Sequence, residues 1–127
     1  MRALRATALL ATALAASACA TPPGVVPGVP HEVRAHPLPP YEIHEECVRL
    51  VPGDRLHWRF EAKAPLAFAI QYREGRTVVL PVTREQAIAD EGTFAPQVAQ
   101  DYCLTWEAGA EGTPLDYTVR LVRGPAR

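Results

Sequence analysis

Imidazole and carboxylate side chains, which bind zinc and copper in proteins, are concentrated in the segment HEVRAHPLPPYEIHEE. The segment contains His31, Glu32, His36, His44, Glu45 and Glu46. The spacing is poor for a metal site, because the first two histidines stand in a proline-rich stretch that must be ordered before it can contribute ligands. On a strand, His44 and Glu46 would share a face, whereas Glu45 would point away. We predict no metal site and no cofactor. A metal-binding protein would use His31, His36, His44 and Glu46.

The remaining side chains offer little for catalysis. Ser17 is the only serine of the chain. His57 would act as a general base only with a nucleophile and an orienting acid nearby, and the sequence places neither beside it. We find no paired-carboxylate motif and no glycine-rich motif. The sequence therefore predicts a protein that is not an enzyme and has no catalytic residues.

The first eighteen residues have the pattern of a signal peptide. Arg2 and Arg5 form a positive start, and residues 6–16 are apolar except for two threonines. Small residues follow, as at a cleavage site. The apolar run is shorter than the roughly 20 residues that a membrane-spanning helix needs. We therefore expect residues 1–18 to be removed on export.

The end of this segment allows two kinds of cleavage. Residues 16–19, Ala-Ser-Ala-Cys, resemble a bacterial lipobox, in which Cys19 would be lipid-modified, with palmitate among the typical acyl chains, and would become the N-terminus. Several acyl chains would hold the protein firmly to a membrane. Ala20 stands where an Asp often retains lipoproteins in the inner membrane, so the sequence favours an outer-membrane lipoprotein facing the periplasm. Ordinary cleavage at an A-x-A site would instead give a free periplasmic protein.

The two other cysteines form an even pair. Cys47 and Cys103 would meet an oxidising compartment after export. A disulfide between them would close a loop of about 55 residues and stabilise the fold by on the order of 4 kcal/mol. A nucleophilic thiol or a metal-bound thiol pair is the alternative.

Composition divides the exported chain into a tether and one domain. Seven of the thirteen prolines fall between Pro22 and Pro40, and we expect residues 19–40 to form an extended, proline-rich tether. The domain then covers residues 41–123. Loss of residues 1–18 leaves 11 basic against 14 acidic side chains, a net charge of −3. This balance argues against nucleic acid as a partner.

Period-two alternation of apolar residues predicts strands throughout this domain. The aligned apolar sets are Leu56, Trp58 and Phe60; Leu66, Phe68, Ile70 and Tyr72; Tyr102, Leu104 and Trp106; Leu115, Tyr117, Val119 and Leu121. Several short strands at regular spacing indicate an all-β protein, a single antiparallel β-sandwich of about six to eight strands. The one helix signal is TREQAIADEG, where Thr83 and Gln86 fit a capping box. It predicts a short helical turn near residues 84–90.

The order of these segments resembles a GOLD domain. The similarity covers LHWRFEAKAPLAFAIQYREGRTVVLPV, GTFAPQVAQDYCLTWEA and LDYTVRL. The aromatic and aliphatic positions that match the family are Trp58, Phe60, Phe68, Ile70, Tyr102, Leu104 and Trp106. The resemblance implies a β-sandwich that works as an interaction module, and the family shares no catalytic residues. Its cargo-receptor branch has a disulfide that Cys47 and Cys103 would reproduce.

The functional expectation follows from location and fold together. We expect a small exported lipoprotein, held to the membrane through Cys19, whose domain is a non-catalytic binding or adaptor module for another envelope protein. A free strand edge is one way to recruit such a partner. The alternative is a periplasmic metal-binding or carrier protein that uses the His/Glu-rich segment. The outward face of the sheet, with His57, Arg59 and Arg120, is expected to be a solvated polar surface.

Overall fold

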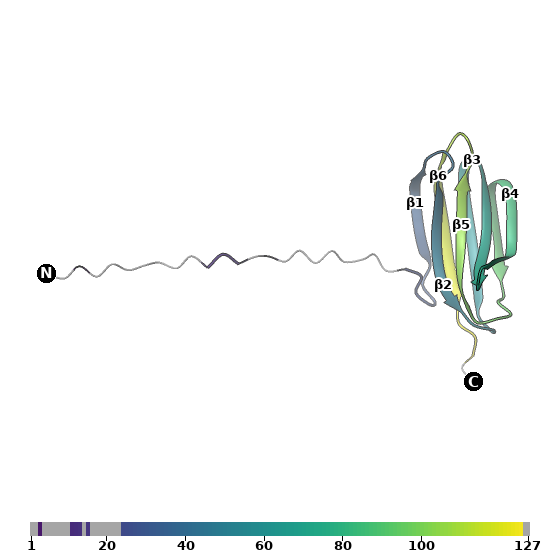
Figure 1. The fold of residues 1–127 in the computed structure, drawn as a ribbon, viewed down its shortest axis with the longest axis horizontal. Helices are drawn as coiled ribbons and strands as arrows, with labels where there is room; N and C mark the ends of the chain where they lie inside the picture. The colour runs from purple at the N-terminus through teal and green to yellow at the C-terminus, as the bar shows by residue number, and fades with distance from the viewer. Residues whose placement is uncertain (1–2, 4–10, 14, 16–23, 126–127) are drawn as a thin grey trace.

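The computed structural model describes residues 3, 11–13, 15 and 24–125, and its domain is built from six antiparallel strands (Figure 1). The strands are β1 (His31–Leu38), β2 (Ile43–Leu50), β3 (Arg55–Glu74), β4 (Thr77–Phe94), β5 (Gln100–Ala108) and β6 (Thr113–Val122). The predicted all-β class is confirmed. No helix in the described part of the chain is long and apolar enough to cross a membrane.

Strand β3 organises the sheet because it changes partner along its length. Its residues 55–62 pair with β6, and its residues 66–71 pair with β5. Strand β4 runs antiparallel to both parts of β3, while β1 extends the sheet beyond β6 and β2 extends it beyond β5. The six strands therefore form one curled sheet, with β1 and β4 on opposite sides of the view in Figure 1.

The core lies on the concave side of this sheet. Its buried side chains include Leu56, Trp58, Phe60, Leu66, Phe68, Ile70, Tyr102, Leu104, Trp106, Leu115, Tyr117, Val119 and Leu121. These are the inward members of the alternating sets, so the period-two prediction of the core is confirmed. The rings of Trp106 and Tyr117 stack at 4.4 Å between centroids, which joins β5 to β6 across the core. Each aromatic contact of this kind adds about 0.5–1.5 kcal/mol beyond the area that it buries.

The predicted helical turn near residues 84–90 is wrong, because these residues belong to β4. Arg84 pairs with Phe68 and Asp90 pairs with Phe60, both on β3. Between them the register shifts and Gln86 has a φ of 52°, which marks a β-bulge rather than a turn of helix. Pairing with the long strand β3 therefore overrides the local capping signal.

The ordered domain also begins earlier than the expected boundary at residue 41. Residues 31–38, which we expected in the tether, form β1 and pair with β6. A bulge between Val33 and His36 interrupts the pairing, and there Asp116 accepts the backbone N–H of Ala35 at 2.6 Å. Pro37 is tolerated because β1 is an edge strand, where a missing N–H leaves no internal acceptor unpaired.

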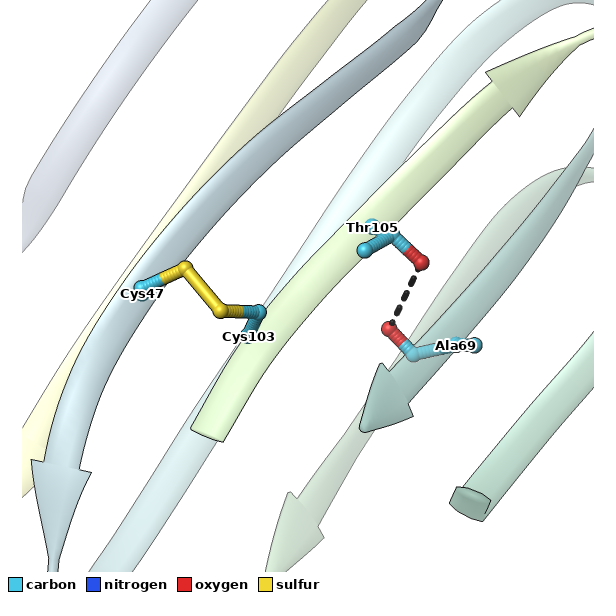
Figure 2. Close-up of a disulfide and its surroundings, with 4 residues drawn as sticks. All are labelled: Cys47, Ala69, Cys103 and Thr105. Atoms are coloured by element: carbon cyan, nitrogen blue, oxygen red, sulfur yellow. Dashed lines mark hydrogen bonds between the residues drawn. A yellow bond between two sulfur atoms is a disulfide. The ribbon is translucent and has the colours of Figure 1, made fainter. Parts of the chain in front are cut away.

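A disulfide joins Cys47 on β2 to Cys103 on β5 (Figure 2). The two residues are direct partners in the register, with Cα atoms 4.0 Å apart. They lie on the outward face, where Thr105 also donates its hydroxyl to the Ala69 carbonyl at 3.5 Å. The bridge therefore fixes the edge strand β2 to its neighbour without occupying space in the core.

One end of the domain is held by a buried carboxylate. Asp54 is 2% exposed and accepts backbone N–H groups from Val51 at 2.9 Å and from Gly124 at 3.1 Å. Arg123 adds an ion pair at 2.7 Å. These donors lower the pKa of Asp54, although burial by itself would raise it. The turn that leads into β3 is thereby fastened to the end of β6.

Candidate site between strands β1, β2 and β6

Strands β1 and β2 are the two ends of the strand path, and the curl of the sheet brings their inward side chains together. The residues that meet there are His31, His36, His44, Glu46 and Tyr117, which we call the histidine cluster. The first two come from β1, the next two from β2, and the tyrosine comes from β6. All four metal-ligand candidates from the sequence are therefore neighbours in space.

A chain of hydrogen bonds links most of these side chains. Tyr117 donates its hydroxyl to Oε2 of Glu46 at 2.9 Å. The same carboxylate oxygen lies 3.1 Å from Nε2 of His31, and Nε2 of His44 lies 2.9 Å from the Tyr117 hydroxyl. His36 joins through its ring, whose centroid is 4.2 Å from that of His44. Glu46 is thus the acceptor for groups from both other strands.

The cluster is sheltered without being sealed. The side chains of His31 and Glu46 are 21% and 15% exposed, and Tyr117 is buried. Trp106 stacks beneath Tyr117, and its indole N–H has no hydrogen-bond partner within the described chain. The polar side chains therefore lie between the buried Trp106 ring and the solvent.

Burial shifts the pKa values of two side chains in the cluster, His44 and Tyr117. The pKa of His44 is lowered, first by desolvation and then by the neighbouring imidazole of His36. The pKa of Tyr117 is raised, first by burial and then by its hydrogen bond to the Glu46 carboxylate. At neutral pH the site consequently presents a neutral His44 imidazole and a protonated tyrosine.

A second group of ligand-type atoms lies on the outward face. Glu45, Cys47 and Cys103 place one ligand atom each within 4.8 Å of one another, the one such trio found among the described residues. Both sulfur atoms are used in the disulfide. This group therefore cannot supply thiolate ligands while the bridge is intact.

The polar residues of the outward face are paired between β3 and β6. His57 pairs with Arg120 and Arg59 pairs with Thr118. A shallow depression of about 510 Å³ on this face is lined by residues that include His57, Glu32 and Glu91. The described hydrogen bond of His57 goes to Thr93 at 2.8 Å rather than to either carboxylate. No side chain in this depression is arranged as an activated nucleophile.

Sequence reasoning placed Tyr117 in the core and missed its part in the cluster. Period-two alternation gives the face of a residue, but it does not reveal which strand lies opposite its hydroxyl. The available signal was chemical, because a buried tyrosine usually needs a hydrogen-bond partner for its O–H. Cys19, the expected lipidation site, lies outside the described residues.

No protein-family model matches the chain, and no curated protein matches it. Among solved structures, a de novo designed double-stranded β-helix is similar, with 20% sequence identity over 73% of this chain and 97% of the designed chain. Its TM-score is 0.39, and this similarity carries no functional argument.

Proposed function

We propose that this protein is a small exported lipoprotein whose domain is a non-catalytic binding module of the bacterial cell envelope. The domain would be a GOLD-like β-sandwich, held to the outer membrane through Cys19. Its work would be to recruit another envelope protein.

The observation that carries this proposal is the free edge of β4. Within the described chain, β4 pairs with β3 alone, so its other side presents unpaired backbone N–H and C=O groups. Three apolar side chains on this strand are exposed, with Val78 at 42%, Leu80 at 49% and Ile88 at 57%. An extended segment of a partner could add to such an edge, with affinity from main-chain hydrogen bonds and specificity from exposed side chains beside it, such as Ile88.

One part of this edge suits strand addition better than the rest. Pro81 and the bulges around it and around Gln86 interrupt the first half of β4. Interruptions of this kind protect an edge from pairing. Residues 89–94, in contrast, keep an unbroken register with β3. The partner segment is therefore expected along the second half of β4, beginning near Ile88.

The change of paired strand along β3, from β6 to β5, supports the interpretation of the fold as a β-sandwich. The strand contributes residues 55–62 to a set with β6 and β1, and residues 66–71 to a set with β5 and β2. Such strands form corners between two packed sheets. The cross-strand bridge from Cys47 to Cys103 also agrees with the disulfide of the cargo-receptor branch.

The attachment of Gly28 to the domain implies a short connection to the membrane. Gly28 donates its backbone N–H to Leu121 at 2.7 Å, so the chain is already part of the domain there. From Cys19 to Gly28 the chain can span at most about 32 Å. A lipid on Cys19 would therefore hold the domain close to the membrane surface and restrict its partners to proteins that reach that surface.

Site-specific photocrosslinking in the native envelope tests this proposal. A photoreactive side chain at Ile88 is expected to give one discrete crosslinked protein. The matched control is Arg120, an exposed residue on β6, whose two edges are both paired. Ile88→Lys, combined with the photoreactive side chain at Glu91 on the same half of β4, should weaken the product. If position 88 gives the same spread of abundant proteins as position 120, β4 is not a recruiting edge.

A further inference from the structure

We propose that the histidine cluster binds one divalent transition-metal ion of the zinc and copper class. The ligands would be Nε2 of His31, an imidazole nitrogen of His44 and the carboxylate of Glu46, with His36 available as the fourth. This site is separate from the β4 edge and does not depend on the envelope-binding role.

The chemistry of the side chains fits such an ion. Three imidazoles and one carboxylate form a donor set suited to zinc, and copper binds the same types of ligand more tightly. His31 Nε2 and Glu46 Oε2 are 3.1 Å apart, close to the separation of two ligands on one tetrahedral ion with bonds of about 2.0–2.2 Å. These two atoms could therefore be bridged by the ion with little movement.

The third ligand requires one rearrangement. His44 Nε2 and Glu46 Oε2 both lie 2.9 Å from the Tyr117 hydroxyl, which separates them in the metal-free arrangement. Rotation of the His44 side chain away from the hydroxyl would bring its nitrogen toward the carboxylate. The Tyr117 hydroxyl would keep its hydrogen bond to Glu46, as groups outside the ligand shell commonly do. Tyr117 is thus assigned a positioning role rather than a ligand role.

The location of the four side chains favours a metal site over an exposed polar surface. Both strands that supply them are secured, β1 by its pairing with β6 and β2 by its pairing with β5 and the disulfide. A flexible tether would lose conformational entropy when it closed around an ion. Because the fold already orders both strands, binding at this site does not carry that cost. Partial exposure of His31 and Glu46 leaves an entry path for the ion.

Metal titration of the full mature chain, extracted from its envelope and stripped with a chelator, tests the assignment. Zn²⁺ added in competition with a chromophoric chelator is expected to bind at about one equivalent, and Co²⁺ should give the intense visible bands of a four-coordinate site. Glu46→Gln and His44→Ala should each weaken Zn²⁺ binding at least about tenfold. Far-UV circular dichroism and a thermal transition establish that each variant is folded.

Two further variants test whether Zn²⁺ binding depends on the proposed ligands. His57 is the fourth histidine of the chain and lies on the outward face, so His57→Gln should leave the affinity unchanged. Tyr117→Phe keeps the buried ring and removes the hydroxyl that orients the Glu46 carboxylate, so it should weaken Zn²⁺ binding less than loss of a ligand does, with the stoichiometry unchanged. The proposal is overturned if the unaltered protein binds Zn²⁺ no more tightly than the His44→Ala/Glu46→Gln double variant. Loss of binding in His57→Gln, or an unchanged affinity in both His44→Ala and Glu46→Gln, would overturn the ligand set.

Discussion

The hydroxyl of Thr113 accepts the backbone N–H of Lys63 at 2.8 Å, at the point where β3 leaves β6 and approaches β5. Between residues 62 and 66, β3 has no partner in the described register with either strand. The same hydroxyl lies 3.3 Å from the backbone N of Ala64. One buried side chain therefore satisfies the donors that the change of partner leaves free.

Thr113→Val should destabilise the fold by about 1–3 kcal/mol, because the isosteric side chain leaves these N–H groups without an acceptor. Thr113→Ser keeps the oxygen and should lose less. Urea denaturation, with the free energy of unfolding extrapolated to water, compares the three proteins. Equal stability of the Val variant would show that water satisfies the two N–H groups.

Asp54→Asn should cost about 2–3 kcal/mol at pH 7, because the substitution removes the charge from an acceptor of three strong hydrogen bonds. The matched control is Asp101→Asn, whose ion pair with Arg49 is exposed at 78% on the Asp side. That change should alter stability by less than about 1 kcal/mol.

The Asp54 effect should also depend on pH in a defined direction. The folded pKa of Asp54 lies below its ordinary value, so its stabilisation is complete above the unfolded value of about 3.9. As the pH falls below that value, the unfolded chain takes up the proton first, and the stabilisation disappears as the pH passes the folded pKa. Unfolding curves of Asp54→Asn and the unaltered protein should therefore converge in acid. A constant difference from pH 7 down to strong acid would contradict this assignment.

Gly92→Ala should destabilise the second half of β4. Gly92 pairs with Trp58, and a Cβ at this position would overlap the Trp58 indole atoms Cζ2 and Cη2. Overpacking of a buried ring costs about 1–3 kcal/mol. Tryptophan fluorescence and urea denaturation should both change, whereas Glu91→Ala, on the exposed side of the same strand, should leave both nearly unchanged. Unchanged stability in Gly92→Ala would contradict this account, because it would mean that the indole moves aside at little cost.

Removal of the Cys47–Cys103 bridge by paired replacement with Ala should cost about 2–5 kcal/mol, because the bridge spans 56 positions of sequence. Denaturation of the oxidised protein, the reduced protein and the double variant measures this effect. The reduced protein and the variant should agree. A reduced protein as stable as the oxidised one would show that β2 is held by its pairing with β5 alone.

The strands with a strict period of two could be predicted from the sequence, because burial of one face imposes the alternation. Trp58 and Phe60 on β3, and Tyr102 and Trp106 on β5, are buried as expected. The helical turn at residues 84–90 was wrong because Thr83 and Gln86 supply a local capping signal, whereas the structure is decided by pairing with β3 far along the chain. Local propensity contains no information about that pairing.

The candidate site was predictable in its residue types and not in its geometry. His31 and His36 were assigned to a tether because prolines surround them, and HEVR, with Val33 as its single apolar residue, carries no period-two signal of a strand. Their approach to His44 depends on the curl of the sheet, which brings β1 and β2 face to face. Such an arrangement follows from the topology of six strands rather than from any local spacing.

Export and attachment at Cys19 underlie the proposed function, and the intact mass of the mature protein tests both directly. The protein would be extracted from its own envelope and measured before and after reduction. The account predicts a chain that begins at Cys19 and carries a diacylglyceryl group and an acyl chain, with a gain of about two daltons on reduction of the disulfide. An unmodified chain, beginning after residue 18 or 20 or still carrying residues 1–18, would contradict the membrane anchor.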